Sequence, residues 1–523
     1  MASADEAWWT GAGGYVAELL SVLAREPERE VLRYRGSAVS GGEYLRSVTG
    51  IYRALSAAGV RHGAVVAVLT ASNSPEILGA RHAAHLLGAA VGHVRSTNPG
   101  TSAAMLPIED QLAILRTTGA SVLYSDRDSS ERARELARLA RIPLVATPNG
   151  EDATAEIEQV SAPWPFAPED LAVVAFTSGS TGKPKGIKKS RRAWDGLVYG
   201  TIALGREAES ITALVATPLN QTVGPMADAA LIQGGRLILL EEFGAHSWVR
   251  AAAEHAATRT FTATTHLYRI LDHLGELGAP DAAGAGLGSL RRLVYAGSSA
   301  APARLATAVK TFGPILFQEY GTSESARISY LFPAEHADPR LCATVGRPFP
   351  EVEIAVADLD SGGPLRDGQV GEIRVRSPHV MDGYLDDVLT ARVLREGWYH
   401  TGDIGYRDER GYLHLLDRVA DVVKIDGVKV YPTVVERETL TLEGITQAVA
   451  YGVRDHDGVE HLFAAITVRP GATVDPDRVR AHLSVTLSPA HAPERVQVLD
   501  EVPVNAAGKP DKPRLRVQSA ATL

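Results

Sequence analysis

The chain has 523 residues, which at roughly 100–200 residues per domain predicts more than one hydrophobic core. Its composition, 45% hydrophobic and 22% charged, excludes intrinsically disordered and collagen-like proteins, and its net charge of −9 argues against non-specific binding to nucleic acid. The one cysteine, Cys342, excludes a disulfide framework and a multi-cysteine metal site.

No apolar run in the sequence approaches the roughly 20 residues of a membrane span. Asp5 and Glu6 stand where a secretory signal carries positive charge. We therefore expect a cytoplasmic protein without a membrane partner.

Residues 1–150 alternate helical patterns with short apolar strands, which is typical of a wound α/β sheet. The pattern predicts a helix over 42–59, a strand over 64–69 and a helix over 75–87. Residues 171–176, LAVVAF, form an apolar run that stops at a Ser/Gly/Thr cluster, which indicates a buried strand. Further strands are predicted over 236–240, 290–296 and 315–318.

From residue 352 the pattern changes to strands and turns, as in GEIRVRS at 371–377. After residue 417 a smaller segment mixes a strand over 462–468 with a helix over 475–487. We therefore predict an α/β fold: a large N-terminal domain of layered sheets and helices with a β-rich subdomain, and a small α+β C-terminal domain.

Lysine is rare and unevenly placed in this chain. Only nine of the 53 basic residues are lysines. Four of them fall in 183–189, two in 424–429 and two in 509–512, which leaves Lys310 by itself. Because arginine serves almost everywhere else, these three stretches are where we look for chemistry.

The segment TSGSTGKPKG at 177–186 directly follows the predicted buried strand. Its glycines let backbone N–H groups turn toward an anion, its hydroxyls add donors, and Lys183 and Lys185 add positive charge, as polyphosphate binding requires. It is not a P-loop, because only two residues separate Gly179 from Gly182. The alternative is a mobile Gly/Ser surface loop.

Three other patterns receive simpler interpretations. The run KKSRR at 188–192 could be a nucleic-acid or targeting patch, but the acidic chain and the lack of interleaved aromatics favour a solvated flank of the phosphate loop. The run GAGLG at 284–288 lacks the strand–helix context of a nucleotide loop and is interpreted as a surface loop. Scattered histidines such as His266, His400 and His491 lack ligand spacing, which argues against a metal site.

Segment 177–186 resembles the phosphate-binding signature of the AMP-forming adenylating enzymes: acyl-CoA synthetases, aryl-CoA ligases, amino-acid adenylation domains and luciferases. The resemblance continues in the family's order through YGTSE at 320–324, GEIRVRSPHVMDGY at 371–384, YHTGD at 399–403, DRVADVVKIDGVKVYPTVVE at 417–436 and NAAGKPDKPRLR at 505–516. The chain is therefore identified as a member of this superfamily.

The resemblance implies a role for each motif. Glu324 coordinates Mg²⁺, a hard cation that prefers carboxylate and phosphate oxygens. Tyr320 covers the adenine face, and Asp403 and Arg418 contact the ribose. Lys509 reaches the α-phosphate and the acid oxygen, where charge builds in the transition state. The implied phosphate-binding residues are Thr177, Ser178, Gly179, Ser180, Thr181, Gly182 and Lys185, with Thr181 also catalytic. Further implied nucleotide contacts are Gly297, Ser298, Ser299, Glu319, Gly321, Thr322 and Lys424.

Each of these residues alone has a simpler interpretation. Asp403 could be only a turn residue, since Thr-Gly-Asp suits turns. Glu324 could be a charge at a helix start, and Lys509 could be any loop lysine. The shared order of the motifs favours the functional interpretation over these.

The segment after the phosphate loop departs from the resemblance. Many CoA ligases carry Pro-Leu/Met-Phe-His where this chain has Pro218, Leu219, Asn220 and Gln221. The two amides predict a pocket more polar than a fatty-acid tunnel, and the Asp that holds an α-amino group is missing, which argues against an α-amino acid.

The implied acid-pocket residues are Asn220, Gln221, His266 and Arg327. An arginine buried at position 327 suggests an anionic substrate, because an unpaired buried charge is costly. The alternative is that Arg327 points to solvent.

The resemblance also predicts how the chain divides and moves. It predicts domains over 1–416 and 417–523, with a hinge near Ala420, where the family usually has Asp or Lys. After adenylation the C-terminal domain is expected to rotate, withdrawing Lys509 and presenting 424–431 for the second half-reaction. Alanine can still serve as a hinge, since such a position need only absorb a φ/ψ change.

Three functions remain open at this stage. The leading one is Mg·ATP-dependent adenylation of a small or polar acid, aromatic acids included, with release of pyrophosphate and transfer to an acceptor, for which CoA is favoured. The alternative is a biosynthetic ligase that applies the same adenylation to nitrite or passes the adenylate to an amine. The third is a non-catalytic nucleotide-binding relative, against which the retained motif residues argue. ATP, Mg²⁺ and CoA are the expected ligands, and a monomer or homodimer without a nucleic-acid partner is the expected state.

Overall fold

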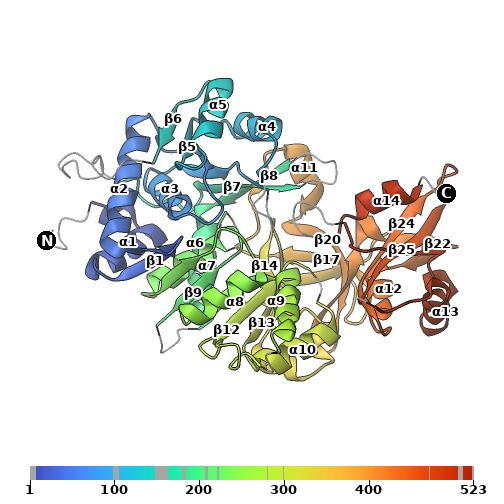
Figure 1. Cartoon of the computed structure of the whole chain (residues 1–523). Helices are drawn as coiled ribbons and strands as arrows, with labels where there is room; N and C mark the ends of the chain where they lie inside the picture. Colours follow the sequence, from blue (N-terminus) through green and yellow to red (C-terminus); the bar gives the residue numbers. More distant parts are fainter. Residues whose placement is uncertain are drawn as a thin grey trace.

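The computed structural model describes residues 8–97, 105–147, 163–178, 184–205, 210–220, 223–278, 281–298, 300–469, 471–503 and 510–520. Figure 1 shows a large layered body that carries the N-terminus at one end of the molecule, and a smaller body that carries the C-terminus at the other. None of the helices in the described residues combines the length and the apolar character that crossing a bilayer requires.

The first sheet of the large body has seven strands in the order β18-β8-β7-β4-β3-β5-β6. The strands from β7 to β6 run parallel, and β8 returns antiparallel to β7. Both strands predicted here, over 64–69 and 171–176, are confirmed as β3 and β7. The bounds are β3 (Val65–Leu69), β4 (Ala90–His93), β5 (Val122–Ser125), β6 (Leu144–Ala146), β7 (Leu171–Ser178), β8 (Pro184–Ser190) and β18 (Gly383–Tyr384).

The second sheet has nine strands in the order β15-β14-β13-β12-β11-β9-β10-β1-β2. Its centre, from β13 to β1, is parallel, and antiparallel strands close both edges. The three strands predicted over 236–240, 290–296 and 315–318 are confirmed, although the last one continues to Thr322. The bounds are β1 (Glu30–Tyr34), β2 (Ser37–Ser40), β9 (Thr212–Val215), β10 (Arg236–Leu239), β11 (Arg259–Ala263), β12 (Arg292–Ala296), β13 (Leu316–Thr322), β14 (Ala326–Leu331) and β15 (Arg347–Pro348).

Helices cover both sheets and fill the space between them, which gives five layers (Figure 1). Apolar faces on two sets of helices cover the outer faces of the sheets, because each sheet must bury its apolar side chains on both sides. The outer helices are α4 (Ile108–Thr118) and α5 (Ser130–Ala140) on the first sheet, and α8 (Ala245–Glu254), α9 (Thr264–Glu276) and α10 (Pro302–Phe312) on the second. The helices between the sheets are α1 (Gly14–Arg25), α2 (Gly41–Ala57), α3 (Pro75–Leu86), α6 (Arg191–Ala203) and α7 (Gly224–Ile232).

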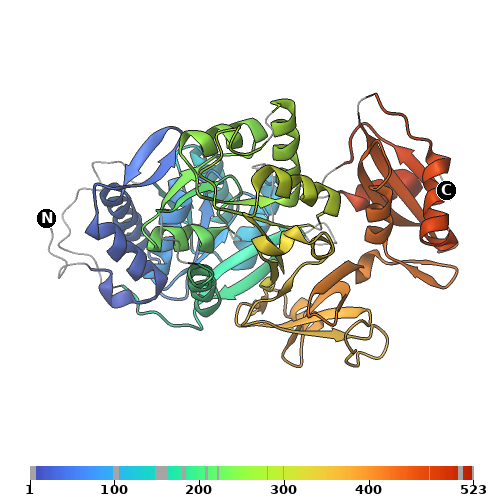
Figure 2. The ribbon, with the colours of Figure 1, turned by 90° about the horizontal axis from the view of Figure 1, so that it is seen from below.

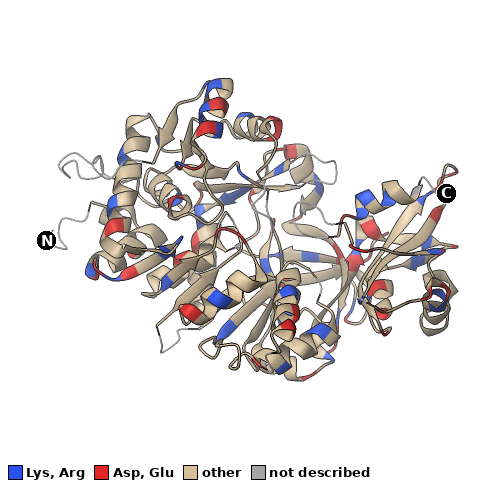
Figure 3. Cartoon of the chain, in the orientation of Figure 1, with Lys and Arg blue, Asp and Glu red and all other residues tan. Residues whose placement is uncertain are grey.

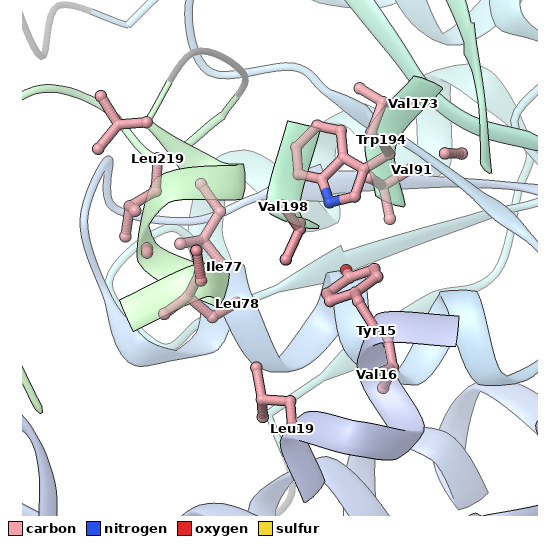
Figure 4. Close-up of a cluster of buried hydrophobic side chains, with 14 of the residues drawn as sticks. Tyr15, Val16, Leu19, Ile77, Leu78, Val91, Val173, Trp194, Val198 and Leu219 are labelled. Atoms are coloured by element: carbon pink, nitrogen blue, oxygen red, sulfur yellow. The ribbon is translucent and has the colours of Figure 1, made fainter. Parts of the chain in front are cut away.

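The inner helices begin where the sequence provides caps. Ser40 and Glu43 form a reciprocal capping box at the start of α2, and a proline opens α3. Side chains from these helices and from both sheets form one continuous core, part of which Figure 4 shows around Trp194 and Tyr15. The helices predicted over 42–59 and 75–87 are confirmed as α2 and α3.

A buried group of polar residues lies among these inner helices, and we call it the Asp228 cluster: Tyr44, Arg81, His82, Trp194 and Asp228. Asp228 Oδ1 lies 2.7 Å from Arg81 Nη2 and 3.0 Å from His82 Nε2. Its Oδ2 accepts a hydrogen bond from Trp194 Nε1 at 3.3 Å, and the Tyr44 hydroxyl lies 2.9 Å from His82 Nδ1. The side chains of Arg81 and Asp228 are 0% exposed, so this ion pair has no contact with water.

The third sheet, of five strands, is antiparallel and connects the large body to the C-terminal body (Figure 2). Its bounds are β16 (Glu353–Ala357), β17 (Gly371–Arg376), β19 (Leu394–Arg395), β20 (Trp398–Arg407) and β21 (Leu413–Arg418), with α11 (Asp387–Val393) beside them. The strand predicted over 371–377 is confirmed as β17.

The C-terminal body packs three helices against small sheets. Its elements are β22 (Val423–Ile425), β23 (Val428–Val430), β24 (Ile445–Arg454), β25 (Glu460–Val468), β26 (Arg495–Val498), α12 (Pro432–Thr439), α13 (Pro476–Thr486) and α14 (Lys512–Ala520). The strand predicted over 462–468 and the helix predicted over 475–487 are confirmed as β25 and α13. The predicted fold class is thereby confirmed. The division between residues 416 and 417 stays a prediction, and β21 continues to Arg418.

The prediction for residues 188–192 is wrong. These residues are not a solvated flank, because Lys189 and Ser190 belong to β8, and Ser190 caps α6 by accepting from the Ala193 N–H. The exposed fractions of Lys189 and Arg191 are only 1% and 5%. Residues 284–288 lie in a turn-rich loop between α9 and β12, in agreement with the predicted surface loop, although Leu287 is buried. Elsewhere basic and acidic residues mix over both bodies in the view of Figure 3.

Candidate active site

Three sheets meet at the place where the family-like motifs gather. Tyr320 stands near the end of β13 in the second sheet, and Glu324 stands in the turn that follows it. Asp403 stands on β20 in the third sheet, and Tyr384 stands on β18 in the first. The Tyr384 hydroxyl donates to Glu324 Oε1 at 2.8 Å, and the Tyr320 hydroxyl donates to Asp403 Oδ2 at 2.5 Å. These two hydrogen bonds join motifs that lie 60 and 83 residues apart in the sequence.

The two ends of the glycine-rich segment belong to β7 and β8, which pair antiparallel. Thr177 pairs with Lys185 and Ser178 with Pro184 across the hairpin, so Lys185 is held opposite Thr177. The predicted phosphate-binding residues Gly179, Ser180, Thr181 and Gly182 lie outside the described residues, as does the side chain of Ser178. Lys185 itself is partly exposed.

Glu324 is presented by a tight turn between β13 and β14, not by a helix start. Thr322 Oγ1 lies 2.9 Å from Ser325 Oγ and accepts from the Ser325 N–H at 3.0 Å, which closes the turn. Ala326 has a φ of +59°, an unfavourable conformation for a residue with a Cβ. Gly321 is needed because a Cβ there would collide with the Ala326 carbonyl oxygen.

Asp403 is buried in strand β20, so its interpretation as a turn residue is wrong. It pairs across the strands with Arg418, whose Nε lies 2.9 Å from Asp403 Oδ1. The Arg418 side chain is 58% exposed and forms the open side of this pair. The Asp403 carboxylate raises the pKa of Arg418, and burial raises the pKa of Tyr320.

Lys189 is a buried cation that the sequence reasoning placed in solvent. Its Nζ donates to the carbonyl oxygen of His379 at 3.3 Å. Burial lowers the pKa of Lys189 to about 8, against the opposing effect of the carboxylates of Glu324 and Asp382. The concentration of lysines in 183–189 was the signal that could have found it.

The Arg327 side chain is only 9% exposed and has a partner inside the protein, which neither of the two sequence interpretations described. Its Nε donates to Glu351 Oε1 at 2.9 Å, and the same oxygen lies 3.2 Å from His379 Nε2. Gly196 and Gly200 on α6 leave the space for His379 and Arg327, because a Cβ at either glycine would collide with them. Since Glu351 already balances its charge, the burial of Arg327 no longer argues for an anionic substrate.

The loop after β12 is fixed to the start of α9. Thr264 Oγ1 donates to the carbonyl oxygens of Ala296 and Ser298, and Gly297 between them has a φ of +97°. Ser299 lies outside the described residues. On the neighbouring strand, burial raises the pKa of Glu319 to about 7.

His266 is buried on α9 and stacks on Phe243 with 3.7 Å between the ring centres. Its Nδ1 has no hydrogen-bond partner in the described part of the chain, and burial lowers its pKa to about 4. The imidazole is therefore neutral near pH 7.

Asn220 is 6% exposed, and its Oδ1 has no hydrogen-bond partner among the described residues. The preceding residue is held in place, because the Leu219 N–H donates to Asn73 Oδ1 at 3.1 Å and Arg81 Nη1 donates to the Leu219 carbonyl. Gln221 lies outside the described residues.

The two lysines assigned to the C-terminal part differ in what can be said of them. The Lys424 side chain is exposed on β22, and its backbone N–H donates to Glu460 at 2.7 Å. Lys509 lies outside the described residues.

A magnesium ion fits the donor set at Glu324. Mg²⁺ is commonly held by one or two carboxylates together with substrate phosphates and water, so the single partly buried carboxylate of Glu324 would be sufficient. In the described residues, the one group of three potential ligands within ligand distance is Asp455, His456 and Asp457, a largely exposed turn in the C-terminal body.

Comparison with known proteins gives consistent matches over nearly the whole chain. Residues 20–385 match the family described as AMP-binding enzyme, and residues 435–509 match the AMP-binding enzyme C-terminal domain. A feruloyl-CoA synthase of Amycolatopsis sp is 31% identical over 92% of this chain and 94% of its own length. A medium/long-chain-fatty-acid–CoA ligase of Mycobacterium tuberculosis is 29% identical over 96% of this chain and 89% of its own.

Among solved structures, the amide bond synthetase McbA from Marinactinospora thermotolerans superposes with a TM-score of 0.85. It is 33% identical, and the match covers 96% of this chain and 99% of that chain.

Proposed function

The chain belongs to the AMP-binding enzyme family and is an AMP-forming acid ligase that uses ATP, and from this premise we propose that its acid is small or polar and that CoA accepts the acyl group. A carboxylate oxygen of the acid attacks the α-phosphorus of ATP, and the bond to pyrophosphate breaks. The CoA thiol, losing its proton, then attacks the carbonyl carbon of the adenylate, and AMP leaves.

Both partners of the first step are anions, so the site must neutralise charge and hold the two in line. We assign the phosphates to Thr177 and Lys185 with the hairpin tip between them, and the ribose to Asp403 and Arg418. The convergence of these motifs from three sheets supports the assignment, because sequence order alone does not require them to meet. A magnesium ion bound by Glu324 neutralises phosphate charge in this scheme.

Tyr320 is assigned to the adenine ring, which a buried aromatic side chain can cover at little entropic cost. Its hydroxyl also fixes one oxygen of Asp403, so the two nucleotide contacts are positioned together. Gly297, Ser298, Ser299, Glu319, Gly321 and Thr322 complete the proposed nucleotide site.

The roles of Lys509 and Thr181 rest on the resemblance alone. We propose that Lys509 stabilises charge on the α-phosphate during adenylation and withdraws when the C-terminal body rotates about Ala420. Lys424 then lies at the site of the second half-reaction. The exposed position of Lys424 leaves it free to approach another surface after such a rotation.

Asn220 supports a polar acid. A buried amide oxygen without a partner is unfavourable unless a ligand or water completes it, and a long alkyl chain offers no hydrogen bond. We therefore expect fatty acids of eight or more carbons to be poor substrates, in contrast to the medium/long-chain-fatty-acid–CoA ligase that is 29% identical.

An amine is the second candidate acceptor, and the 33% identity to an amide bond synthetase favours it. The adenylation step and its residues are the same in both cases. Only the nucleophile that attacks the adenylate differs.

The test is a pyrophosphate-release panel of aliphatic, aromatic and dicarboxylic acids and nitrite, each with CoA, with an amine or with neither. We expect pyrophosphate release with short polar or aromatic acids. When CoA is present, the acyl group of the adenylate should be transferred to CoA and AMP should be released. Pyrophosphate release that requires an amine would support the amine, not CoA, as the acceptor. A preference for long-chain fatty acids would contradict the polar pocket.

A further inference from the structure

A small pocket lies at the carboxyl ends of β3 and β4, next to the segment that follows β9. Its lining residues are Val68, Thr70, Ser72, Ile77, His93, Arg95, Ser96, Pro218 and Asn220. Ligands of open α/β sheets bind outside the carboxyl ends of the strands, which is where this pocket lies. Its free volume is about 10 Å³, roughly the room of one water molecule or one non-hydrogen atom of a ligand.

Three polar atoms in this lining have no hydrogen-bond partner within the described residues: Ser72 Oγ, His93 Nε2 and Asn220 Oδ1. Each of the three residues is only 6% exposed, so bulk water does not satisfy them. Buried polar groups in folded proteins are nearly always paired, and a cluster of three exceptions around one cavity calls for a ligand.

We propose that this pocket receives a hydroxyl or amino substituent of the acid substrate, so that the acid carries such a group as well as its carboxyl. The proposal rests on the proposed function, because it takes Asn220 to face the acid. It adds Ser72 and His93, which none of the family-like motifs contains.

The chemistry of the lining selects this class of substituent. Burial lowers the pKa of His93 to about 3, so the ring is neutral and each ring nitrogen either donates or accepts. The Ser72 hydroxyl does both, and Asn220 Oδ1 only accepts. A hydroxyl or amino group donates and accepts at once, and can therefore satisfy all three residues.

Other occupants fit less well. A carboxylate or a nitrite ion cannot donate to Asn220 Oδ1 and therefore leaves at least one of the three atoms unpaired. A methyl group has the right size but leaves all three polar atoms unpaired. A permanently bound water fits the volume, and it is the alternative that the experiment must exclude.

The experiment compares matched acids on the full-length protein. Benzoate, its three hydroxy, three amino and three methyl derivatives, and the corresponding cinnamates are assayed for pyrophosphate release. We expect at least one hydroxy or amino acid to exceed its methyl isostere by about 10³-fold or more in kcat/KM, because sites built to hydrogen-bond a group reject analogues that lack it by up to roughly 10⁴–10⁵-fold. Ser72→Ala should reduce that ratio about tenfold.

Ser74→Ala is the matched control. Ser74 Oγ is also buried without a partner in the described part of the chain, but it does not line the pocket, so this variant should keep the wild-type ratio. His93→Phe, which fills the pocket, should also abolish the preference and serves if Ser72→Ala folds poorly.

The outcomes separate the two proposals. Turnover with equal rates for hydroxy and methyl acids, or an unchanged ratio in Ser72→Ala, overturns the subsite and leaves the acid ligase intact. If no acid is turned over, calorimetric titration of the same pairs decides the subsite directly: tighter binding of the hydroxy or amino acid supports it, and equal binding overturns it.

Discussion

The Asp228 cluster and the region around Glu324 each contain a buried cation, but the two cations differ in their partners. Arg81 is in direct contact with Asp228 at 2.7 Å. His82 and Trp194 make further hydrogen bonds to the same carboxylate. Lys189, equally buried, makes one hydrogen bond within the described residues, to a backbone carbonyl, and has a lowered pKa. The first arrangement neutralises the buried charge by direct contact, although Arg81 Nε has no hydrogen-bond partner in the described residues. The second keeps an unfavourable charge beside the residue we assign to magnesium.

This difference teaches which buried polar groups carry function. Where partners are nearly complete, as in the Asp228 cluster, the group stabilises the fold. Lys189 lacks a carboxylate in hydrogen-bond contact among the described residues, and Ser72, His93 and Asn220 each carry an unpaired polar atom there, so we expect these groups to lower stability in return for binding. Substitutions in the two regions should therefore change different observables.

Asp228→Ala should have the largest effect, because it leaves Arg81 buried without its counter-charge. We expect the free energy of unfolding to fall by about 3–5 kcal/mol, measured by urea denaturation. Asp128→Ala is the control, since it removes a half-exposed partner of Arg35 and should cost about 1 kcal/mol or less. Equal, small losses in both variants would remove the distinction between the regions.

Glu324→Gln should have the opposite effect to Asp228→Ala: a small change in stability and a large loss of activity. The amide can still accept from Tyr384, so the free energy of unfolding should change by less than about 1 kcal/mol. Pyrophosphate release should fall roughly 10²–10³-fold, the scale for losing one preorganised electrostatic group. Glu353→Gln, on the exposed edge of the third sheet, controls for loss of a carboxylate. A wild-type rate at ordinary Mg²⁺ concentration would refute the assignment.

Lys189→Met should raise stability while it lowers activity. The folded pKa of Lys189, about 8, is below the value of about 10.4 in an unfolded chain, so the unfolded chain binds more protons between these pH values. The wild type should therefore gain stability as pH rises from 8 to 10.4, and the penalty is fully present below pH 8. In Lys189→Met the free energy of unfolding should not show this rise with pH. At pH 7 it should exceed the wild-type value by about 1–3 kcal/mol.

The measurement is the difference between the two stability profiles over pH 7 to 11, with Lys188→Met as control for loss of a neighbouring lysine. Pyrophosphate release should decrease in Lys189→Met, because a charge beside Glu324 is removed. A destabilised variant would show that Lys189 belongs with Arg81 in the structural class.

Ser72→Ala should have the smallest effect on stability. Its hydroxyl has no partner in the described residues, so we expect the free energy of unfolding to change by about 0.5 kcal/mol or less. Thr260→Val is the comparison, because the Thr260 hydroxyl donates to the Leu214 carbonyl at 3.0 Å, and its loss should cost about 1 kcal/mol. Thermal unfolding resolves the two, and a larger loss in Ser72→Ala would mean that its hydroxyl is already satisfied.

Much of the fold could be predicted from local patterns. The helices α2 and α3 and the strands β3 and β7 follow from periodicity and caps that lie within the segments themselves. The strand β8 could not, because PKGIKKS has the composition of a surface segment, and only its pairing with β7 and with β18, which is distant in the sequence, makes it a strand.

The candidate site was predictable as a set of motifs and not as a geometry. The order of motifs indicated Tyr320, Glu324, Asp403 and Arg418. In the structure Asp403 contacts both Tyr320 and Arg418. The partner of Arg327 lies 24 residues away at Glu351, and no local pattern connects the two. The pocket escaped prediction for the same reason, although a histidine inside the apolar run AAVGHV was a signal.

The most direct test of the central claim, that the three sheets form an acid-adenylating site, is acid-dependent exchange of pyrophosphate into ATP by the wild type and by Asp403→Asn. We expect exchange in the wild type with the best acid of the panel and without CoA. We also expect a loss of roughly 10²-fold in Asp403→Asn, with a raised KM for ATP and an unchanged KM for the acid. Exchange at the wild-type rate in Asp403→Asn, or no exchange with any acid in the wild type, would contradict the central claim.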